Sequence, residues 1–483
     1  MASETTLTWA TVAPAIAEIY LAIAVCVLLL VDVFYGEKRR GLTPTLTLAA
    51  LALGALLTAQ FGAVTERVTL FNGMFVADEL GHFLKLAGFV FVGFALLYSR
   101  TYLEQREILK GEYYVLALTA LLGIFVMVSA ASLLTMYIGV ELLALSVYAM
   151  VAFDRDSGIA AESAMKYFVL GSIASGALLY GMSIVYGVTG TLSLDELAGQ
   201  LRGELSAGVI LGLVFIVVAV AFKLGAVPFH MWLPDVYHGA PTSVTLFIGT
   251  APKIAYFALA LRLLAEGLQG AVAEWSQMLA ALAVLTLVVG NVVAIVQSNL
   301  KRMLAYSTIS NVGFIVLGFV AGTPEGYSAA LYYTLVYVLM SLGTFGVILL
   351  ASRKGFEADE LDHYKGLHAR DPMLAFVMMV LMFSTAGIPP FVGFWAKLRI
   401  IQELWATSHP WLILIAIVMS VVGAFYYLRV VKLMYFDDPV DTAPLNPGFD
   451  MRVLLSANGL AQLVLGGLPG PLMALCLYAI EAL

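Results

Sequence analysis

The chain consists largely of unbroken apolar stretches, and this pattern restricts it to one class of fold. A helix needs about 20 apolar residues to cross the hydrocarbon core of a bilayer. The stretches are continuous and do not alternate in polarity, which excludes the strands of a membrane barrel. With 61% hydrophobic and 12% charged residues in 483, the chain cannot bury this surface in a soluble core. The sequence therefore predicts an all-α polytopic membrane protein.

Hydropathy predicts about fourteen transmembrane helices. Their ranges are 12–34, 42–60, 80–99, 113–130, 133–152, 161–187, 208–231, 242–264, 276–297, 303–321, 327–350, 373–404, 411–434 and 453–478. The first is not expected to be a cleaved signal, because its apolar run is too long and Glu4 stands where a signal would be basic. All of these stretches are therefore interpreted as membrane spans.

Basic residues lie mostly at one set of helix ends. Those on the same side as the first loop are Lys38, Arg39, Arg40, Arg100, Arg106, Lys110, Arg155, Lys301, Arg302, Arg353, Lys354, Lys365, Arg370, Arg429, Lys432 and Arg452. Only Arg67, Arg202 and Arg262 fall clearly on the opposite side. The positive-inside rule expects such an asymmetry. It predicts a bacterial inner-membrane protein with a cytoplasmic first loop and both termini in the periplasm.

The ionisable side chains of most interest inside the predicted spans are Glu141, Lys166, Lys223, Lys253 and Lys397. A charge at membrane depth costs at least about 2.5–3.5 kcal/mol on insertion scales, so such residues usually line an ion or proton pathway. Their presence predicts that the chain moves protons or other cations.

Helix-breaking residues interrupt two of the spans. Residues 227–234 read VPFHMWLP, and residues 387–395 read GIPPFVGFW. Paired Pro/Gly interruptions of this kind indicate broken helices at the ion site of a transporter built from repeats. The unpaired backbone groups of a break are tolerated where protein or trapped water satisfies them, and water suits proton transfer. The alternative is that the prolines only kink packed helices.

The two breaks predict two five-helix repeats, made of spans four to eight and nine to thirteen. Because five is odd, the second repeat must be inverted relative to the first. The predicted organisation is a three-helix segment (1–110), a first repeat (111–270), an inverted second repeat (271–436) and a C-terminal helix (437–483).

Lys223 is the strongest candidate for a proton relay. A desolvated amine gives up its proton more readily, and an approaching carboxylate reverses that effect. Glu141 and Lys223 are therefore interpreted as one switch, with a static ion pair as the alternative. Lys253 and Lys397 are further relay candidates. The alternative for these lysines is a side chain that extends to the membrane surface, and it is strongest for Lys166.

Secondary candidates lie near the breaks. His230 and His238 flank the predicted turn at 232–235, and histidine titrates near neutral pH, although a lone loop histidine usually has no such role. A polar stripe in span ten could order water or bond neighbouring helices, and it contains Tyr306, Ser307, Thr308, Ser310 and Asn311. Glu18 and Asp32 in the first span are isolated and receive no role.

No motif for redox or nucleotide chemistry is visible. Cys26 and Cys476 lie in separate apolar spans, and the chain contains no CxxC, HExxH, P-loop or GxGxxG pattern. The net charge of -7 is spread over the loops without a basic face, so no nucleic-acid partner is expected.

The residues around the breaks resemble a known family. Residues 222–242 read FKLGAVPFHMWLPDVYHGAPT, 251–253 read APK and 394–398 read FWAKL. These runs resemble the antiporter-like subunits of respiratory complex I, with the match extending over about residues 110–435. Residues 162–168 (ESAMKYF) and 235–241 (DVYHGAP) resemble the branch called subunit N of the bacterial NADH:quinone oxidoreductase.

The resemblance implies a proton channel lined by Glu141, Lys223, Lys253 and Lys397, driven by quinone reduction elsewhere in the complex. It implies that NADH, FMN, iron–sulfur clusters and quinone bind to other subunits, and that this chain holds no cofactor and no metal. The implied partners are other complex I membrane subunits, including a sister antiporter-like subunit and small membrane subunits, together with lipids.

Three functions remain open from the sequence. The first is proton pumping in a redox-driven complex. The second is a role in a multi-subunit sodium/proton antiporter or a membrane-bound hydrogenase, which share the fold and the lysines. The third is a membrane scaffold with an inactive channel.

Overall fold

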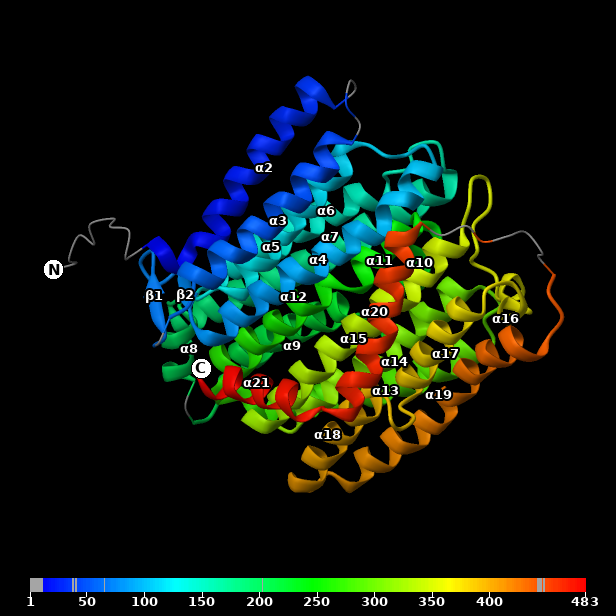
Figure 1. The fold of residues 1–483 in the computed structure, drawn as a ribbon. Coiled ribbons are helices and arrows are strands. Elements are labelled where there is room, and N and C mark those ends of the chain that lie inside the picture. The colour runs from blue at the N-terminus through cyan, green and yellow to red at the C-terminus, as the bar shows by residue number, and fades with distance from the viewer. Residues whose placement is uncertain are drawn as a thin grey trace.

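The computed structural model describes residues 12–36, 39, 41–64, 66–201, 203–440, 445 and 448–483. Glu4, Lys38, Arg40 and Arg202, which the sequence interpretation used, lie outside the described residues. The described chain forms a bundle of long, roughly parallel helices (Figure 1). The predicted helical membrane fold is confirmed.

The N-terminal segment contains η1 (Ala13–Ala15), α2 (Ile16–Tyr35), α3 (Leu42–Phe61), β1 (Val68–Leu70), β2 (Phe75–Ala77) and α4 (Glu79–Gln105). The next part contains α5 (Gly111–Val128), α6 (Leu133–Val151), α7 (Gly158–Thr189), α8 (Leu194–Gln200), α9 (Ala207–Leu224), α10 (Trp232–Gly239), α11 (Thr242–Gly249), α12 (Ala251–Ala260), the π-helix η2 (Leu261–Gly267) and η3 (Gln269–Ala271).

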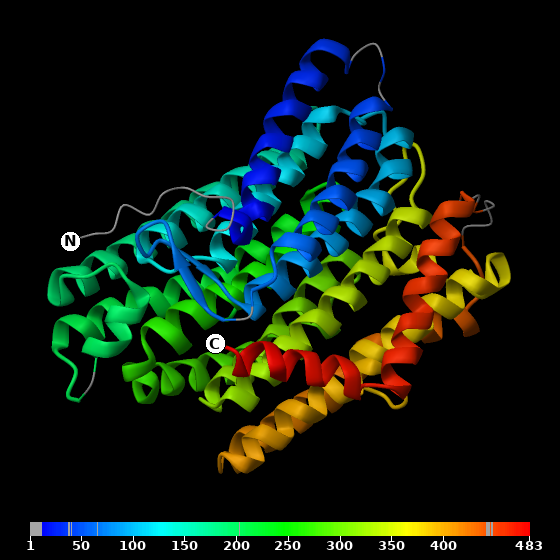
Figure 2. The same ribbon diagram turned by 60° about the vertical axis from the view of Figure 1, so that its left-hand side comes forward.

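The remaining elements are α13 (Val272–Ile295), α14 (Leu300–Val320), α15 (Pro324–Ala351), η4 (Leu361–Tyr364), α16 (Leu367–Arg370), α17 (Pro372–Ala386), α18 (Val392–Ala406), α19 (Pro410–Phe436), α20 (Phe449–Gly467) and α21 (Gly470–Glu481). Helix α2 leans away from the bundle and exposes much of its apolar surface (Figure 2).

Among the described residues, twelve helices are long and apolar enough to cross a membrane, and the pair α20 and α21, bent by 80°, makes thirteen if it is one span. The predicted count of fourteen is reached only when α17 and α18 are also joined as one broken span. The prediction of a continuous helix over 453–478 was therefore wrong, because the chain turns between Gly467 and Gly470, at Pro469.

A short hairpin was not predicted. Strands β1 and β2 pair antiparallel, with Val68 opposite Ala77 and Leu70 opposite Phe75. The connection contains Asn72 at φ 56° and Gly73 at φ 79°, and this dipeptide favours tight hairpin turns because both residues tolerate positive φ.

Ion pairs tie the loops together at the two ends of the bundle. At one end Arg302 pairs with Asp235 at 2.9 Å, Arg452 pairs with Asp371 at 3.0 Å, and Arg106 pairs with Glu357. All three basic residues belong to the group that the sequence assigned to the first-loop side. The contacts agree with that grouping.

At the other end, Arg262 is fully buried and pairs with Asp78 and Glu266, both at 2.7 Å. Arg67 pairs with Glu266 at 3.1 Å and donates to the backbone carbonyl of Leu483 at 3.1 Å. The hairpin and the end of α21 lie at this same end (Figure 1). The two ends of the described chain therefore lie on one side of the bundle.

Both predicted breaks are present and have the same backbone form. Helix α9 ends at Leu224 and α17 ends at Ala386, and each is followed by a left-handed glycine, Gly225 at φ 88° or Gly387 at φ 86°. Three residues further on, a cis peptide bond precedes Pro228 or Pro390. The predicted span 242–264 is also interrupted, at Thr250, where φ is −120° and ψ is −92°.

Candidate functional site

The first broken helix ends beside a buried lysine. Lys223 is the last residue but one of α9, and it is 3% exposed. Its Nζ lies 3.2 Å from the hydroxyl oxygen of Ser175 in α7 and donates to it. A serine hydroxyl can accept from an ammonium group or donate to a neutral amine. This partner is therefore compatible with both protonation states of Lys223.

Glu141 lies in the middle of α6, near Lys223. The carboxylate is near enough for a favourable coulombic interaction with the Lys223 amine, but the hydrogen bond of Lys223 goes to Ser175. Glu141 Oε1 is buried without a hydrogen-bond partner among the described residues. A buried acceptor of this kind is costly to leave unpaired. The two groups are thus neighbours, but no ion pair joins them in this structure.

Lys253 reaches the end of the same broken helix from a different element. It is 1% exposed and belongs to the first turn of α12. Its Nζ donates a 3.0 Å hydrogen bond to the backbone carbonyl of Leu224, the last residue of α9. A cation at this position is favoured because the C-terminal end of a helix carries partial negative charge.

Lys397 occupies the corresponding position at the second break. Its Nζ donates a 2.9 Å hydrogen bond to the carbonyl of Ala386, the last residue of α17, and lies 5.2 Å from the ring centroid of Phe314. Leu224 and Ala386 hold the same place, directly before the left-handed glycine of each break. In each half, a lysine therefore bonds the equivalent carbonyl.

The polar stripe predicted in span ten is part of a buried hydrogen-bond cluster. Its pairs are Ser307 with Tyr427 at 2.5 Å, Asn311 with Tyr333 at 2.8 Å, Thr308 with Tyr337 at 2.6 Å, and Ser310 with Asn291 at 2.7 Å. These contacts join α14 to α13, α15 and α19. Interhelical bonding, one of the two alternatives left open by the sequence, accounts for these members of the stripe.

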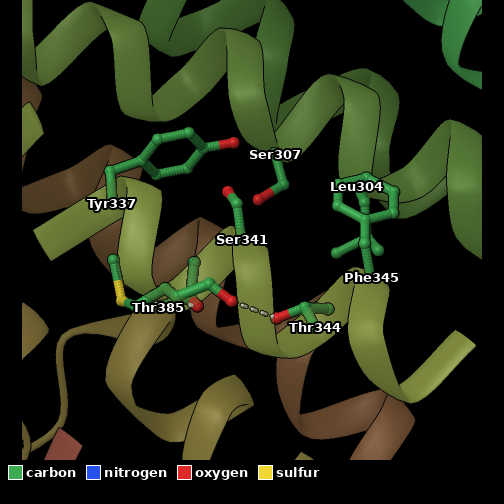
Figure 3. A pocket seen from close by; sticks show the side chains of 8 residues that line it. Leu304, Ser307, Tyr337, Ser341, Thr344, Phe345 and Thr385 are labelled. Atoms are coloured by element: carbon green, nitrogen blue, oxygen red, sulfur yellow. Dashed lines mark hydrogen bonds between the residues drawn. The ribbon is translucent and has the colours of Figure 1, made fainter. Parts of the chain in front are cut away.

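A small polar cavity adjoins this cluster beside the second break. It has a volume of about 10 Å³, which is near the smallest volume that holds one water molecule. The hydroxyls of Ser307, Tyr337 and Ser341 point toward one another there (Figure 3). Thr385 also lines the cavity and directly precedes Ala386, the residue whose carbonyl binds Lys397. The cavity thus adjoins both the hydroxyl cluster and the last turn of α17.

Lys166 differs from the three other lysines because it reaches the end of the bundle. Its side chain is 45% exposed and pairs with Glu162 and Asp235, both at 2.9 Å. Lys166 therefore has the geometry of a lysine that extends to the membrane surface, which was the alternative to a relay role.

The two histidine candidates are both half-buried, but their surroundings differ. His230 Nδ1 is buried without a hydrogen-bond partner among the described residues, and its ring centroid lies 6.4 Å from that of Tyr306. His238 lies in α10, which is a short helix where the sequence predicted a turn at 232–235. Burial, together with the neighbouring Lys301 and Arg302 cations, lowers the pKa of His238.

Sequence reasoning missed Lys301 as a buried charge, because it assigned this residue to a loop. Lys301 is 2% exposed, and its Nζ donates a 2.8 Å hydrogen bond to the carbonyl of Ala240 at the end of α10. Asn299 caps α14 by accepting a hydrogen bond from the Arg302 backbone amide. Asparagine is a preferred N-cap residue, so Asn299 was a signal that the helix begins before Lys301.

Sequence reasoning also missed an ion pair within the N-terminal helices. Glu18 is not isolated: it pairs with buried Lys85 at 2.8 Å and accepts a hydrogen bond from Ser129. Asp32 likewise accepts a hydrogen bond from Thr43 at 2.7 Å. Glu18 and Lys85 lie at similar depth in two spans that begin on the same side, and this spacing could have predicted their contact.

The described residues contain no group of three or more His, Cys, Asp or Glu side chains that could hold a metal ion. The candidate site consists instead of lysines, one carboxylate and neutral hydroxyls around two helix breaks. A helical membrane protein with buried ionisable groups at paired broken helices belongs to the class of antiporter-like ion-translocating subunits.

Comparisons with known proteins identify the family. Residues 130–423 match the family described as NADH:quinone oxidoreductase/Mrp antiporter, transmembrane, and the chain belongs to it. NADH-quinone oxidoreductase subunit N of Thiobacillus denitrificans is 57% identical over 470 residues, which cover 97% of each chain. The resemblance seen in the sequence, including that to the subunit N branch, is confirmed.

Solved structures agree with this assignment. A chain of respiratory complex I from Thermus thermophilus with bound aureothin is 30% identical, with a TM-score of 0.81 over 95% of this chain and 98% of that one. A chain of the Mrp complex from Dietzia sp. DQ12-45-1b has a TM-score of 0.85 over 98% of this chain and 97% of that one, but is only 22% identical and shows the fold alone.

Proposed function

We propose that this chain is the proton-translocating membrane subunit of a bacterial NADH-quinone oxidoreductase, with Glu141, Lys223, Lys253 and Lys397 as its proton relay. The observation that carries the proposal is the pair of equivalent breaks, each with a lysine bonded to the last helical carbonyl. Burying a charge inside a membrane costs free energy, so charges at such positions usually line an ion pathway.

The relay begins with Glu141 and Lys223. Because the two groups are neighbours without a formed ion pair, a small movement can bring them together. Their approach would favour a protonated Lys223 beside an ionised Glu141, since each charged form stabilises the other. Lys253 and the break at Leu224 follow, and the hydroxyls of α14 and α15 lead toward Lys397. Neutral hydroxyls donate and accept at once, so they can pass a proton without holding a charge.

The division into two inverted five-helix repeats is part of the proposal. The matched helix ends at Leu224 and Ala386, each followed by a left-handed glycine, support it. NADH, FMN, iron–sulfur clusters and quinone would bind to partner subunits, and this chain would be driven through contacts with a sister antiporter-like subunit and small membrane subunits.

The similarity at 57% identity favours this function over a sodium/proton antiporter or membrane-bound hydrogenase subunit. Copurification with a peripheral arm that oxidises NADH would support the first function. Isolation of the chain in a complex that exchanges sodium for protons without oxidising NADH would favour the alternative. Loss of pumping in a lysine variant that still assembles would exclude an inactive scaffold.

The central test is Lys223→Arg in the complete complex. A guanidinium keeps the positive charge but holds its proton with a pKa above about 12, so it cannot relay. We expect normal assembly, with quinone reduction and proton translocation both reduced about tenfold or more. Lys432→Arg is the matched control, because Lys432 is exposed and pairs with Asp437 outside the site. Near-normal pumping in Lys223→Arg would mean that Lys223 supplies only a fixed charge.

The orientation is also proposed, with both termini in the periplasm. Single cysteines near Arg39, Arg155 and Lys365 should resist membrane-impermeant reagents added from the periplasm, in a background without Cys26 and Cys476. Cysteines near Arg67 and Arg202 should react. The reverse labelling pattern would overturn the orientation.

A further inference from the structure

The C-terminal helix α20, which lies outside both proposed repeats, packs directly on the second break. The Trp395 indole of α18 donates a 2.8 Å hydrogen bond to the Gly466 carbonyl of α20. A Cβ atom at Gly466 would lie 2.1 Å from the carbonyl oxygen of Pro390, so only glycine permits this approach. In Figure 1, α20 crosses the bundle between the N-terminal and C-terminal parts of the chain.

A buried amide side chain of α20 also hydrogen-bonds to a residue in the last turn of α17, at the second break. Gln462 is fully buried, and its Oε1 accepts a 2.9 Å hydrogen bond from the Ser384 hydroxyl of α17. The same Ser384 oxygen accepts a 3.2 Å hydrogen bond from the backbone amide of Gly393, in the first turn of α18. Ser384 therefore joins the last turn of α17 to the first turn of α18. Its hydroxyl also lies 3.3 Å from the Met340 sulfur, but the Gln462 oxygen is the stronger acceptor and orients the hydroxyl.

This connection runs alongside the bond made by Lys397. Ser384 lies two residues before Ala386 in α17, and Gly393 lies four residues before Lys397 in α18. Residues four apart in a helix share a face. The contacts of Ser384 with Gly393 and of Lys397 with Ala386 are thus two neighbouring links across one break. We therefore expect a change in the first link to shift the geometry of the second.

We propose that Gln462 is a positioning residue for Lys397: through Ser384 it holds the two parts of the broken helix α17–α18 at the separation that sets the contact of Lys397 with Ala386. This inference rests on the proposed relay role of Lys397. Gln462 itself carries no proton in this scheme.

Asn458 provides a matched comparison one turn earlier in α20. It is also a buried amide, and its Nδ2 donates a 3.1 Å hydrogen bond to the Leu339 carbonyl of α15. It accepts a 3.4 Å hydrogen bond from Gln462 Nε2, but among the described residues it makes no hydrogen bond across the break. If buried amides of α20 served only to bind helices together, Asn458 and Gln462 would be interchangeable in effect.

The test uses Gln462→Met and Asn458→Leu in the complete complex. Each substitution replaces a buried amide by an apolar side chain of similar size. We expect Gln462→Met to assemble normally and to reduce quinone reduction and proton translocation about twofold to tenfold, the range of one buried hydrogen bond. Asn458→Leu should have less effect on both rates. Equal effects of the two variants, or no effect of Gln462→Met, would overturn the proposal.

Ser384 variants test the route of the effect and remain informative if Gln462→Met fails to assemble. Ser384→Ala removes the shared oxygen and should reproduce the loss, while Ser384→Thr keeps a hydroxyl and should restore most activity. The double variant Gln462→Met with Ser384→Ala should be no worse than either single variant, because both remove one link. Additive losses, or equal activities of Ser384→Ala and Ser384→Thr, would contradict the positioning role.

Lys397→Arg separates this proposal from the function on which it rests. Complete loss of pumping in Lys397→Arg with normal pumping in Gln462→Met would reject only the positioning role. Normal pumping in Lys397→Arg would reject the relay itself.

Discussion

The two broken helices share a backbone but differ in the side chains that surround them. At the first break, Lys253 comes from a separate helix and bonds Leu224, while Lys223 and Glu141 add two further charges. At the second break, Lys397 belongs to the second part of the broken helix itself and bonds Ala386. The two breaks thus share a backbone conformation, but the lysine that bonds the last helical carbonyl comes from a separate helix at the first break and from the broken helix itself at the second.

The side chains around the two breaks also differ in chemical type. The first has ionisable groups and one serine, Ser175. The second adjoins hydroxyl and amide side chains, with Ser307, Tyr427 and the small cavity among them. Ionisable groups can store a proton, whereas neutral hydroxyls can only pass one on. In the proposed relay, the first half would therefore hold charge, and the hydroxyls of the second half would pass protons toward Lys397.

The largest expected effect tests the charge pair of the first half. In Glu141→Ala with Lys223→Ala, no unpaired buried charge remains, so a purely structural pair would recover its function. We expect the double variant to assemble but to pump no better than either single variant, about tenfold or more below the native rate. Recovery of most proton translocation would show that the pair only balances charge.

A smaller effect is expected from Ser175→Ala, which removes the hydrogen-bond partner of Lys223. A buried charged group that loses one partner costs about 1–3 kcal/mol, and part of this cost should appear as a rate decrease of about threefold to tenfold. Proton translocation measured beside quinone reduction checks it. Ser183→Ala is a control, since Ser183 lies on the same helix, is exposed, and donates to the backbone carbonyl of Leu179 one turn earlier.

The hydroxyl cluster of the second half should be more tolerant. Tyr427→Phe removes one hydroxyl that bonds Ser307, and a water molecule or a neighbouring hydroxyl can replace it, so a decrease of about twofold is expected. Proton translocation rates measured for Tyr427→Phe would sharpen the comparison. A loss as large as that of Lys223→Arg would contradict the comparison of the two halves, because a neutral group would then be as important as a relay lysine.

The smallest effect on activity is expected from Thr286→Val at the first break. The Val227 backbone amide donates a 2.9 Å hydrogen bond to the Thr286 hydroxyl of α13. Loss of this acceptor should lower the free energy of unfolding by about 1–3 kcal/mol while activity changes little. Thermal unfolding of the purified complex measures the first quantity. A large activity loss at normal stability would place Thr286 in proton transfer.

The sequence predicted the helical membrane fold and both breaks because these depend on local composition. Apolar runs require spans, and the Gly and Pro residues at 225–228 and 387–390 prevent a regular helix. The bend before Gly470 and the interruption at Thr250 were missed, since they depend on packing as much as on local residues. The hairpin was missed although Asn72 and Gly73 favour it.

The sequence predicted which lysines lie near the two breaks, but it did not predict which atoms they contact. Lys223, Lys253 and Lys397 were recognisable because a charge in an apolar run is rare. Hydropathy carries no information about which atoms a lysine meets, so the bonds to Ser175, Leu224 and Ala386 could not be derived from it. The role of Gln462 was also invisible, because a neutral amide in a span gives no signal of comparable strength.

The left-handed glycines have a consequence for mutational tolerance. Any other L-residue at Gly225 or Gly387 would be strained by about 1–2 kcal/mol. It would also meet a neighbour, since a Cβ atom at Gly225 would lie 2.6 Å from Leu233 Cδ1 and one at Gly387 would lie 2.8 Å from Lys397 Cδ. The second collision falls on the lysine of the site itself. In a saturation survey of this chain, Gly387 should therefore accept as few replacements as the charged residues do, although it has no side chain with which to bind a proton.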